Sequence, residues 1–110
     1  MRFELGALPD DPLGAAAAFH AGALPEILAL LAEGAAVVTL VFPPDDPLHR
    51  AWREAAVAGL ARQSAPARVN AVAGGDAAAI DAAAAFFAAA DAVTGQYLPL
   101  DSQPGAALLG

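Results

Sequence analysis

The chain has 110 residues, 58% of them hydrophobic, and a formal net charge of −7. That length suffices for one compact domain, and the acidic balance argues against nucleic acid and anionic membrane surfaces as partners. The absence of cysteine excludes disulfides, thiol catalysis and cysteine-based metal sites. Lysine is also absent, and 33 residues are alanine, the best helix former and a poor core filler. We therefore expect an oligomer that completes a modest core.

The sequence predicts neither a membrane span nor a signal peptide. Its longest stretch without a formal charge, from Pro12 to Pro25, has 14 residues, whereas a span needs about 20 apolar ones. Acidic residues stand at positions 4, 10 and 11, where a signal peptide has a basic and then an apolar region. We expect a cytoplasmic protein from a bacterium whose proteins are rich in alanine.

The N-terminal half predicts a short strand, a helix and a buried strand. Residues 2–5 alternate polar and apolar side chains, which is typical of a strand. Residues 14–33 have helical spacing, interrupted by Pro25, and Gly34 is a suitable end for that helix. Residues 35–42 are apolar and β-branched without alternation, as in a strand covered on both faces within a parallel sheet.

The rest of the chain continues this alternation of helices and strands. A helix is predicted over residues 48–63, a strand over 68–73, a helix over 77–90 and a last strand over 93–100. Together these elements predict one domain over residues 1–101, followed by a flexible tail over 102–110. The predicted fold class is α/β: a truncated Rossmann-like fold of three layers, with about four mostly parallel strands and three helices.

Two stretches resemble the short-chain dehydrogenase/reductase superfamily. The first, Ala55 to Gly75, resembles the family's active-site helix and the "RVNAVAPG" strand that follows it. The second, Phe86 to Asp101, is similar to the family's "FLAS…VTGQ…VDGG" ending. Their order and spacing match as well. The resemblance covers residues 20 to 101 and implies the C-terminal half of the family's domain, with Asn70 as the structural asparagine of the "RVN" motif.

The resemblance implies that this chain lacks the family's catalytic groups. The family's acid/base tyrosine and the lysine four residues later align with Arg50 and Glu54. The family's serine falls on Val41 or Phe42, and the proline near the nicotinamide is Gly74. The sequence contains no glycine-rich phosphate-binding turn. We therefore expect no catalytic residue, no bound cofactor and no hydride transfer by this chain alone.

Polar residues before the second long helix have both a functional and a structural interpretation. Asp45, Asp46 and His49 are the nearest approach to a set of metal ligands. One of these aspartates is expected to cap the helix instead, so we predict no metal site.

The charged residues inside that helix also allow two interpretations. Arg50, Arg53 and Glu54 could bind a carboxylate or a phosphate along one edge. A solvated face with local ion pairs is the favoured interpretation.

The resemblance also implies where subunits would meet. In the family, the helix that matches residues 48–63 and the helix before it form a four-helix bundle between subunits. The interface candidates are therefore Phe19, Leu24, Trp52, Ala55, Ala56 and Gly59. Trp52 suits either such an interface, because aromatic anchors dominate interface energetics, or the core of one chain. Thr94, Gly95 and Tyr97 would lie near a second subunit contact.

The first strand is expected to have an open edge. In the resembled family its counterpart pairs with a strand of the cofactor half, so residues 2–5 would expose unpaired backbone groups here. A second copy, a partner chain or the chain's own tail would cover them.

Several functions remain open from the sequence. The first is a non-catalytic subunit that forms a homodimer through its first two helices, or a hetero-oligomer with a full-length short-chain dehydrogenase that it stabilises. The second is small-molecule binding or new chemistry in a vestigial cleft at Val41, Phe42 and Gly74, with Arg50 and Glu54 as polar groups. A third is an NAD(P)-dependent oxidoreductase that is active only with a full-length partner chain, and a fourth is a decayed enzyme.

Overall fold

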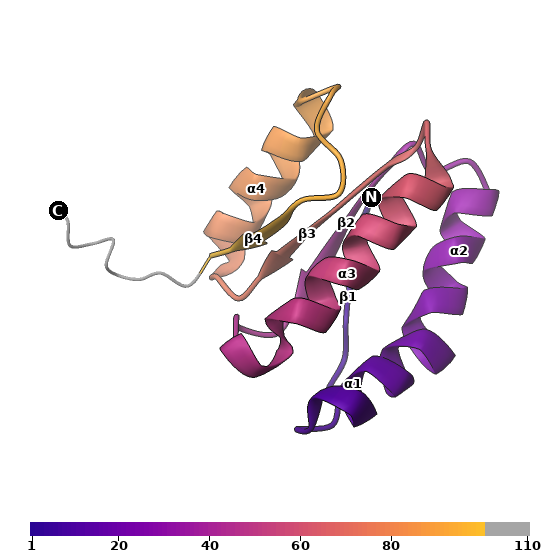
Figure 1. Cartoon of the computed structure of the whole chain (residues 1–110). Helices are drawn as coiled ribbons and strands as arrows, with labels where there is room; N and C mark the ends of the chain where they lie inside the picture. The colour runs from indigo at the N-terminus through magenta and orange to yellow at the C-terminus, as the bar shows by residue number, and fades with distance from the viewer. Residues whose placement is uncertain (101–110) are drawn as a thin grey trace, which may run out of the picture.

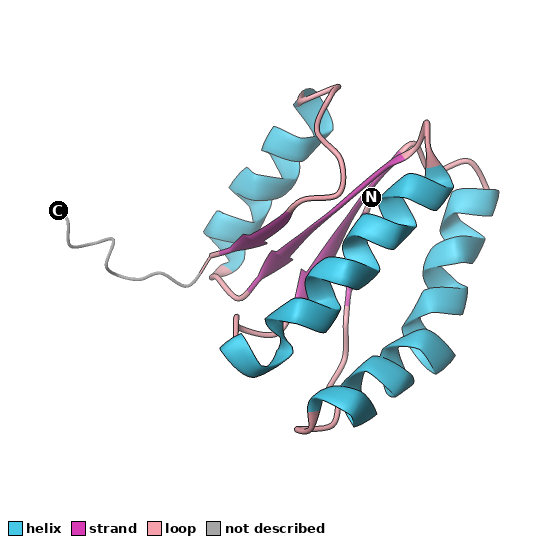
Figure 2. Ribbon diagram, viewed as in Figure 1, coloured by secondary structure: helices cyan, strands magenta, loops and turns pink. Residues whose placement is uncertain are grey.

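A computed structural model describes residues 1–100 as a four-stranded parallel sheet with helices on both faces (Figures 1 and 2). The predicted α/β fold, with a Rossmann-like parallel sheet, is therefore confirmed. The tail predicted over residues 102–110 lies outside the described residues.

The four strands lie in the sheet in the order of the chain, and all run parallel. They are β1 (Arg2–Glu4), β2 (Val37–Phe42), β3 (Arg68–Ala73) and β4 (Tyr97–Pro99). Both central strands, β2 and β3, are buried over all but their first residue. Helices cover both faces of these two strands, which explains why the sequence of β2 is apolar and β-branched without alternation.

The first helical run connects β1 to β2 and widens before Pro25. It consists of α1 (Pro12–Ala18), one π-helical turn η1 (Phe19–Ala23) and α2 (Leu24–Ala32). Proline has no N–H to donate to the carbonyl four residues back. In the wider turn the N–H of Leu24 bonds to the carbonyl of Phe19, five residues back, so the helix accommodates the proline without ending.

By length and composition alone, this run of residues 12–32 could cross a membrane. Its charge-free part ends before Glu26, but the helix continues past that residue. In the fold the run lies against the sheet, with Phe19 and Ile27 fully buried. One apolar side facing a sheet is the burial pattern of a helix in a globular domain.

The helices divide the core into two clusters, one on each face of the sheet. α3 (Pro47–Ser64) lies beside the first helical run on one face, and α4 (Ala77–Ala89) covers the other face (Figure 1). Leu40 of β2 belongs to the cluster under α3, whereas Val41 and Val72 belong to the cluster under α4. Successive residues of a strand point to opposite faces, so both clusters share the same strands.

The position of α4 reverses the hand of the last crossover connection. Because the strand order follows the chain order, connections over the same face have the same hand, and the first two are right-handed as usual (Figure 1). The connection from β3 to β4 passes over the opposite face and is therefore left-handed. As a result, the loops after β2 and β3 leave the carboxyl end of the sheet toward opposite faces. In open α/β sheets, ligands bind beyond the carboxyl ends of the strands at the point where such connections diverge.

The last strand is shorter than the sequence predicts. Within the predicted range of residues 93–100, only β4 (Tyr97–Pro99) forms a strand. The side chain of Asn70, which is fully buried, replaces part of the backbone hydrogen bonding that a longer β4 would form with β3. Its amide donates to the carbonyl of Val93 at 3.1 Å and accepts from the N–H of Gln96 at 3.0 Å. Gly95 has a φ of +79°, which no strand contains. The structural role expected of Asn70 is confirmed.

Both edges of the sheet carry features that hinder further strand pairing. β1 pairs with β2 on one side and has no neighbouring strand among the described residues on the other, as predicted. Its two charged residues are Arg2, which pairs with Asp81 of α4, and Glu4. At the opposite edge, Pro99 lacks an N–H. Charged residues and proline are common protections of open edges.

Replacing Asn70 with alanine should lower the free energy of unfolding by about 2–4 kcal/mol, because a buried N–H and a buried carbonyl both lose their partner. Urea unfolding measures this loss, and Arg62→Ala, an exposed change on α3, serves as the control. A loss at position 70 no larger than in the control would contradict the role of Asn70.

Candidate functional site

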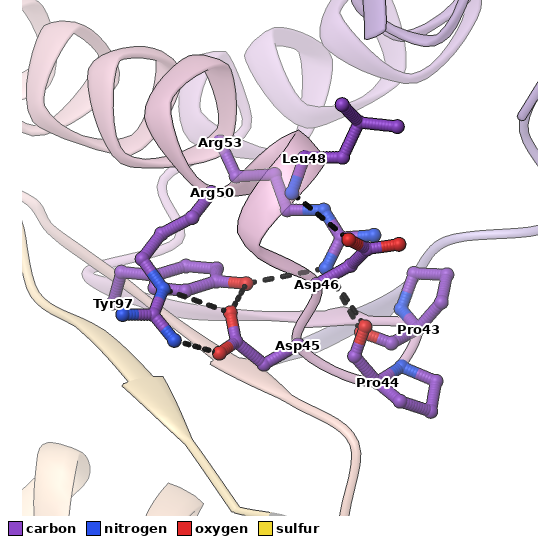
Figure 3. A network of polar contacts seen from close by, with 8 residues as sticks. All are labelled: Pro43, Pro44, Asp45, Asp46, Leu48, Arg50, Arg53 and Tyr97. Carbon is purple, nitrogen blue, oxygen red and sulfur yellow. Dashed lines mark hydrogen bonds and ion pairs between the residues drawn. The ribbon is translucent and has the colours of Figure 1, made fainter. Parts of the chain in front are cut away.

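Side chains from three parts of the chain meet at the carboxyl end of the sheet (Figure 3). Arg50 and Arg53 come from the N-terminal turns of α3, Asp45 from the loop after β2, and Tyr97 from β4. The hydroxyl of Tyr97 donates to Oδ1 of Asp45 at 2.9 Å and accepts from Nη1 of Arg53 at 3.1 Å. Arg50 donates two hydrogen bonds to the same carboxylate. Nε donates to Oδ1 at 3.2 Å, and Nη2 donates to Oδ2. The four side chains form one connected network.

The charges in this network follow from its contacts. The hydrogen bonds from Arg50 hold the pKa of Asp45 below its ordinary value of 3.8. Burial raises the pKa of the Tyr97 hydroxyl above its ordinary value of 10.0. At neutral pH the aspartate is therefore charged and the tyrosine neutral, and the charges of Asp45 and Arg50 offset each other.

Arg53 is buried, which corrects the solvated face that the sequence predicts for it. Only 4% of the residue is exposed, and its guanidinium carbon lies 5.1 Å from the centre of the Phe42 ring. Nη1 also donates to the carbonyls of Pro43 and Pro44, at 3.1 and 3.2 Å. Among residues 1–100, no carboxylate forms an ion pair with this side chain.

The helical spacing contained the signal for this burial. Arg53 stands four residues before Val57 and seven before Leu60, and both of those apolar residues are buried on the inner side of α3. An interpretation based on composition gives more weight to the charge of Arg53 than to its place on the helix. It therefore predicts that residues 50–54 are exposed. In the structure the oxygens around Nη1 make burial of the charge acceptable.

Trp52 and His49 fix each other inside the chain. The indole N–H can only donate, and it donates to Nδ1 of His49 at 3.0 Å. The imidazole therefore carries its hydrogen on Nε2, which donates to the carbonyl of Asp10 at 2.8 Å. The indole lies 5.6 Å from the Phe19 ring and 5.9 Å from the Phe42 ring. Trp52 is thus half-buried and packs against the core of its own chain.

The residues considered as metal ligands have separate partners. Asp45 belongs to the network, the side chain of Asp46 accepts from the N–H of Leu48 at 2.9 Å and caps α3, and His49 bonds to a backbone carbonyl. In the part of the chain that the structure describes, no three metal-ligating side chains gather.

The residues of the predicted vestigial cleft do not form one site. Val41 and Phe42 lie in clusters on opposite faces of the sheet. Gly74 is buried, and its N–H donates to the carbonyl of Phe42 at 3.1 Å. Arg50 is held by the network, and Glu54 is exposed one turn further along α3.

The other predicted interface residues gather around one groove. A cavity of about 280 Å³ lies between the first helical run and α3, and we call it the helix groove. Its lining contains the predicted residues Phe19, Leu24, Ala55, Ala56 and Gly59, together with His20, Leu28, Leu60 and Gln63. A Cβ atom added at Gly59 would meet nothing within 4 Å, so the middle of the groove is open.

The residues predicted near a second subunit contact lie beside α4. Thr94 and Tyr97 line a cavity of about 390 Å³ with the exposed side chains of Phe86 and Leu98. The hydroxyl of Thr94 accepts from the N–H of Val69 at 3.0 Å, which holds the segment around Gly95 against β3.

A further cavity of about 170 Å³ lies where β1 and β2 end, and the sequence analysis does not identify it. We call it the Arg53 cavity. Its lining consists of Leu8, Pro9, Asp10, Ala15, Pro43, Pro44, Asp46, His49 and Arg53. These residues come from three separate segments, so no local motif reveals the cavity.

A family model described as short chain dehydrogenase-like protein matches residues 3–100, which span all four strands and the helices between them. The chain belongs to this family. The expected relationship is therefore confirmed. No curated protein and no solved structure matches the chain.

The nicotinamide dinucleotide that the superfamily implies does not fit the residues present in this short-chain dehydrogenase-like chain. Pyrophosphate binding uses the free N–H groups and the positive dipole at a helix N-terminus. Here Asp11, Asp46 and Asp76 cap α1, α3 and α4, each accepting from a backbone N–H of the first turn, at 2.7, 2.9 and 2.8 Å. Each carboxylate accepts from one backbone N–H of its helix N-terminus, and its negative charge would repel phosphate.

Asp45→Asn should lower the free energy of unfolding at pH 6 by about 1–3 kcal/mol, because charge-assisted hydrogen bonds are lost. Since the pKa of Asp45 is lowered in the folded state, its charge stabilises the fold above the unfolded value of about 3.9, and this contribution disappears as pH falls below that value.

Denaturant unfolding at pH 6 and pH 3 compares the wild-type chain, Asp45→Asn and the control Glu33→Gln, which removes an exposed carboxylate at the end of α2. The difference between Asp45→Asn and the wild type should shrink at pH 3. An equal difference at both pH values would show that the charge of Asp45 does not stabilise the fold.

Proposed function

We propose that this family member is a non-catalytic protein that acts by association, with a second copy bound at the helix groove. The observation that carries this proposal is the chemistry at the positions aligned with the family's tyrosine and lysine. Those positions hold Arg50, which is bonded to Asp45, and Glu54, which is exposed.

The proton chemistry of these groups supports a non-catalytic role. In the family an adjacent ammonium lowers the pKa of the tyrosine hydroxyl, which makes it a usable acid and base near neutral pH. The bond to Asp45 raises the already high pKa of Arg50. Tyr97 is the one tyrosine of the sequence, and burial raises its pKa as well. Neither group suits proton transfer at neutral pH.

The helix groove supports association. Its walls are apolar, and Ala55, Ala56 and Gly59 on α3 are small enough to let the backbone of another helix approach closely. A two-fold symmetric pair would place the same helices of both copies against each other. This proposal describes a cytoplasmic homodimer, and docking of a full-length relative on the same groove is the alternative that the experiments below also detect.

Gly59→Arg should convert the dimer to a monomer, because the new side chain would extend into the groove from a position where an added Cβ meets nothing within 4 Å. Light scattering after gel filtration should give twice the 10.9 kDa chain mass for the wild-type protein and one chain mass for the variant. Gly22→Arg is the matched control, since it makes the same change at an exposed glycine outside the groove.

Two outcomes would overturn homodimerisation through the groove. One is a wild-type chain that stays at 10.9 kDa at high concentration. The other is a Gly59→Arg protein that remains dimeric. Recovery of the wild-type chain with a full-length dehydrogenase from the native cell, abolished by Gly59→Arg and not by Gly22→Arg, would identify the alternative occupant.

Titration of the pure chain with NADH should give no saturable change in nucleotide fluorescence, because the aspartate caps occupy the helix N-termini. The same titration with a co-purified full-length relative tests whether the chain adds to nucleotide binding or turnover. Saturable binding by the isolated chain, or oxidation of NADH with a carbonyl substrate, would contradict the non-catalytic role.

A further inference from the structure

We infer that the Arg53 cavity binds a small monocarboxylate, which the unpaired edge of the Arg53 guanidinium holds. This site is separate from the helix groove and does not depend on the proposed association. The inference rests on the hydrogen bonds of Arg53, on the size and walls of the cavity, and on the charges that line it.

The hydrogen bonds of Arg53 are distributed unevenly over its three nitrogens. Nη1 donates to the carbonyls of Pro43 and Pro44 and to the hydroxyl of Tyr97. Neither Nε nor Nη2 has a partner among the described residues, and Nε is closed off from water. The N–H groups of Nε and Nη2 point in the same direction, with the spacing of two carboxylate oxygens. Arg53 therefore has two unused N–H donors on one edge of its guanidinium, which we call the fork.

Burial makes this unused fork costly. A buried donor without a partner destabilises the fold, and it does so more strongly when the group is charged. Asp45 does not relieve the cost, because it reaches Arg53 only through the Tyr97 hydroxyl and is itself neutralised by Arg50. A carboxylate from a ligand would supply both the missing acceptors and the missing negative charge.

The cavity limits the size and character of that ligand. Its volume of about 170 Å³ is below the roughly 300–1,000 Å³ of sites for drug-sized molecules. Leu8, Pro9, Ala15 and Pro43 contribute apolar side chains to a lining that also contains charged and polar residues. These features favour a carboxylic acid with a short aliphatic chain. The first bond forms with Nη2, and the bond to Nε follows once the side chains that cover it shift.

The charges that line the cavity limit the ligand to a single negative charge. Asp10 and Asp46 contribute carboxylates to the lining, which oppose every negative charge of a ligand, so a dicarboxylate or a phosphate would be repelled more strongly than a monocarboxylate. His49 contributes no donor, because both of its nitrogens already have partners. Arg53 is therefore the one cationic group in the lining that the structure describes.

Sodium butyrate is the probe, followed by ¹H–¹⁵N NMR of the intact chain at constant ionic strength. We expect saturable shifts at the backbone amides of Leu8, Asp10 and Ala15 and at the Nε–H of Arg53. Butyramide, which has nearly the same shape without the charge, and sodium phosphate should each cause no saturable shift. Arg53→Lys, which keeps the charge but loses the fork, should weaken butyrate binding about tenfold or more.

Arg62→Lys is the matched control, because it makes the same change at an exposed arginine of the same helix. If Arg53→Lys does not fold, Leu8→Trp, which fills the cavity and leaves Arg53 in place, should abolish the butyrate shifts. The site is overturned by butyrate shifts no larger than those of sodium chloride, by equal shifts with butyramide or phosphate, or by unchanged affinity in the variant that folds.

Discussion

Arg53 carries a positive charge into the interior of the chain, and three oxygens around one of its nitrogens hold it there. Two of them are carbonyls of the Pro43–Pro44 turn after β2, and the third is the hydroxyl of Tyr97 on β4. A buried charge needs such partners, because an unpaired one would cost more than a small domain can tolerate. The need ties the loop after β2 to α3 and to the last strand. It also orients the Tyr97 hydroxyl toward Asp45, so the Tyr97 hydroxyl and the Asp45 carboxylate are both engaged in contacts within the chain.

The same contacts explain how a member of the short-chain dehydrogenase-like family can keep the scaffold with different chemistry at its carboxyl edge. The parallel strands and the left-handed last crossover depend on the apolar faces of β2 and β3 and on the Asn70 side chain that replaces part of the β4 ladder. None of these interactions involves a group that transfers protons. Three aspartates cap the helices at the edge where the superfamily places a dinucleotide. They stabilise the helices of an isolated chain and make the same positions unsuitable for phosphate.

The two surfaces proposed to bind partners both involve α3, but they differ in chemistry. The helix groove is apolar and lined by small residues of α3, which suits another helix. The Arg53 cavity is small and lies where β1 and β2 end, with one cation and two carboxylates around it, which suits a small ligand. The two linings have no residue in common, so the two surfaces are distinct sites.

The sequence by itself determined the elements of this protein and its family. An apolar run without alternation predicts β2, aspartates before helices predict caps, and two motifs carry the family resemblance. These features depend on neighbours within a few residues, so they can be predicted locally. The tertiary structure alone decided that Trp52 packs against the core of its own chain, that Val41 and Phe42 face opposite clusters, and that Arg53 is buried. The partner that makes burial of Arg53 possible is 44 residues away in the chain, and only the packing of β4 beside β3 brings that hydroxyl to the guanidinium.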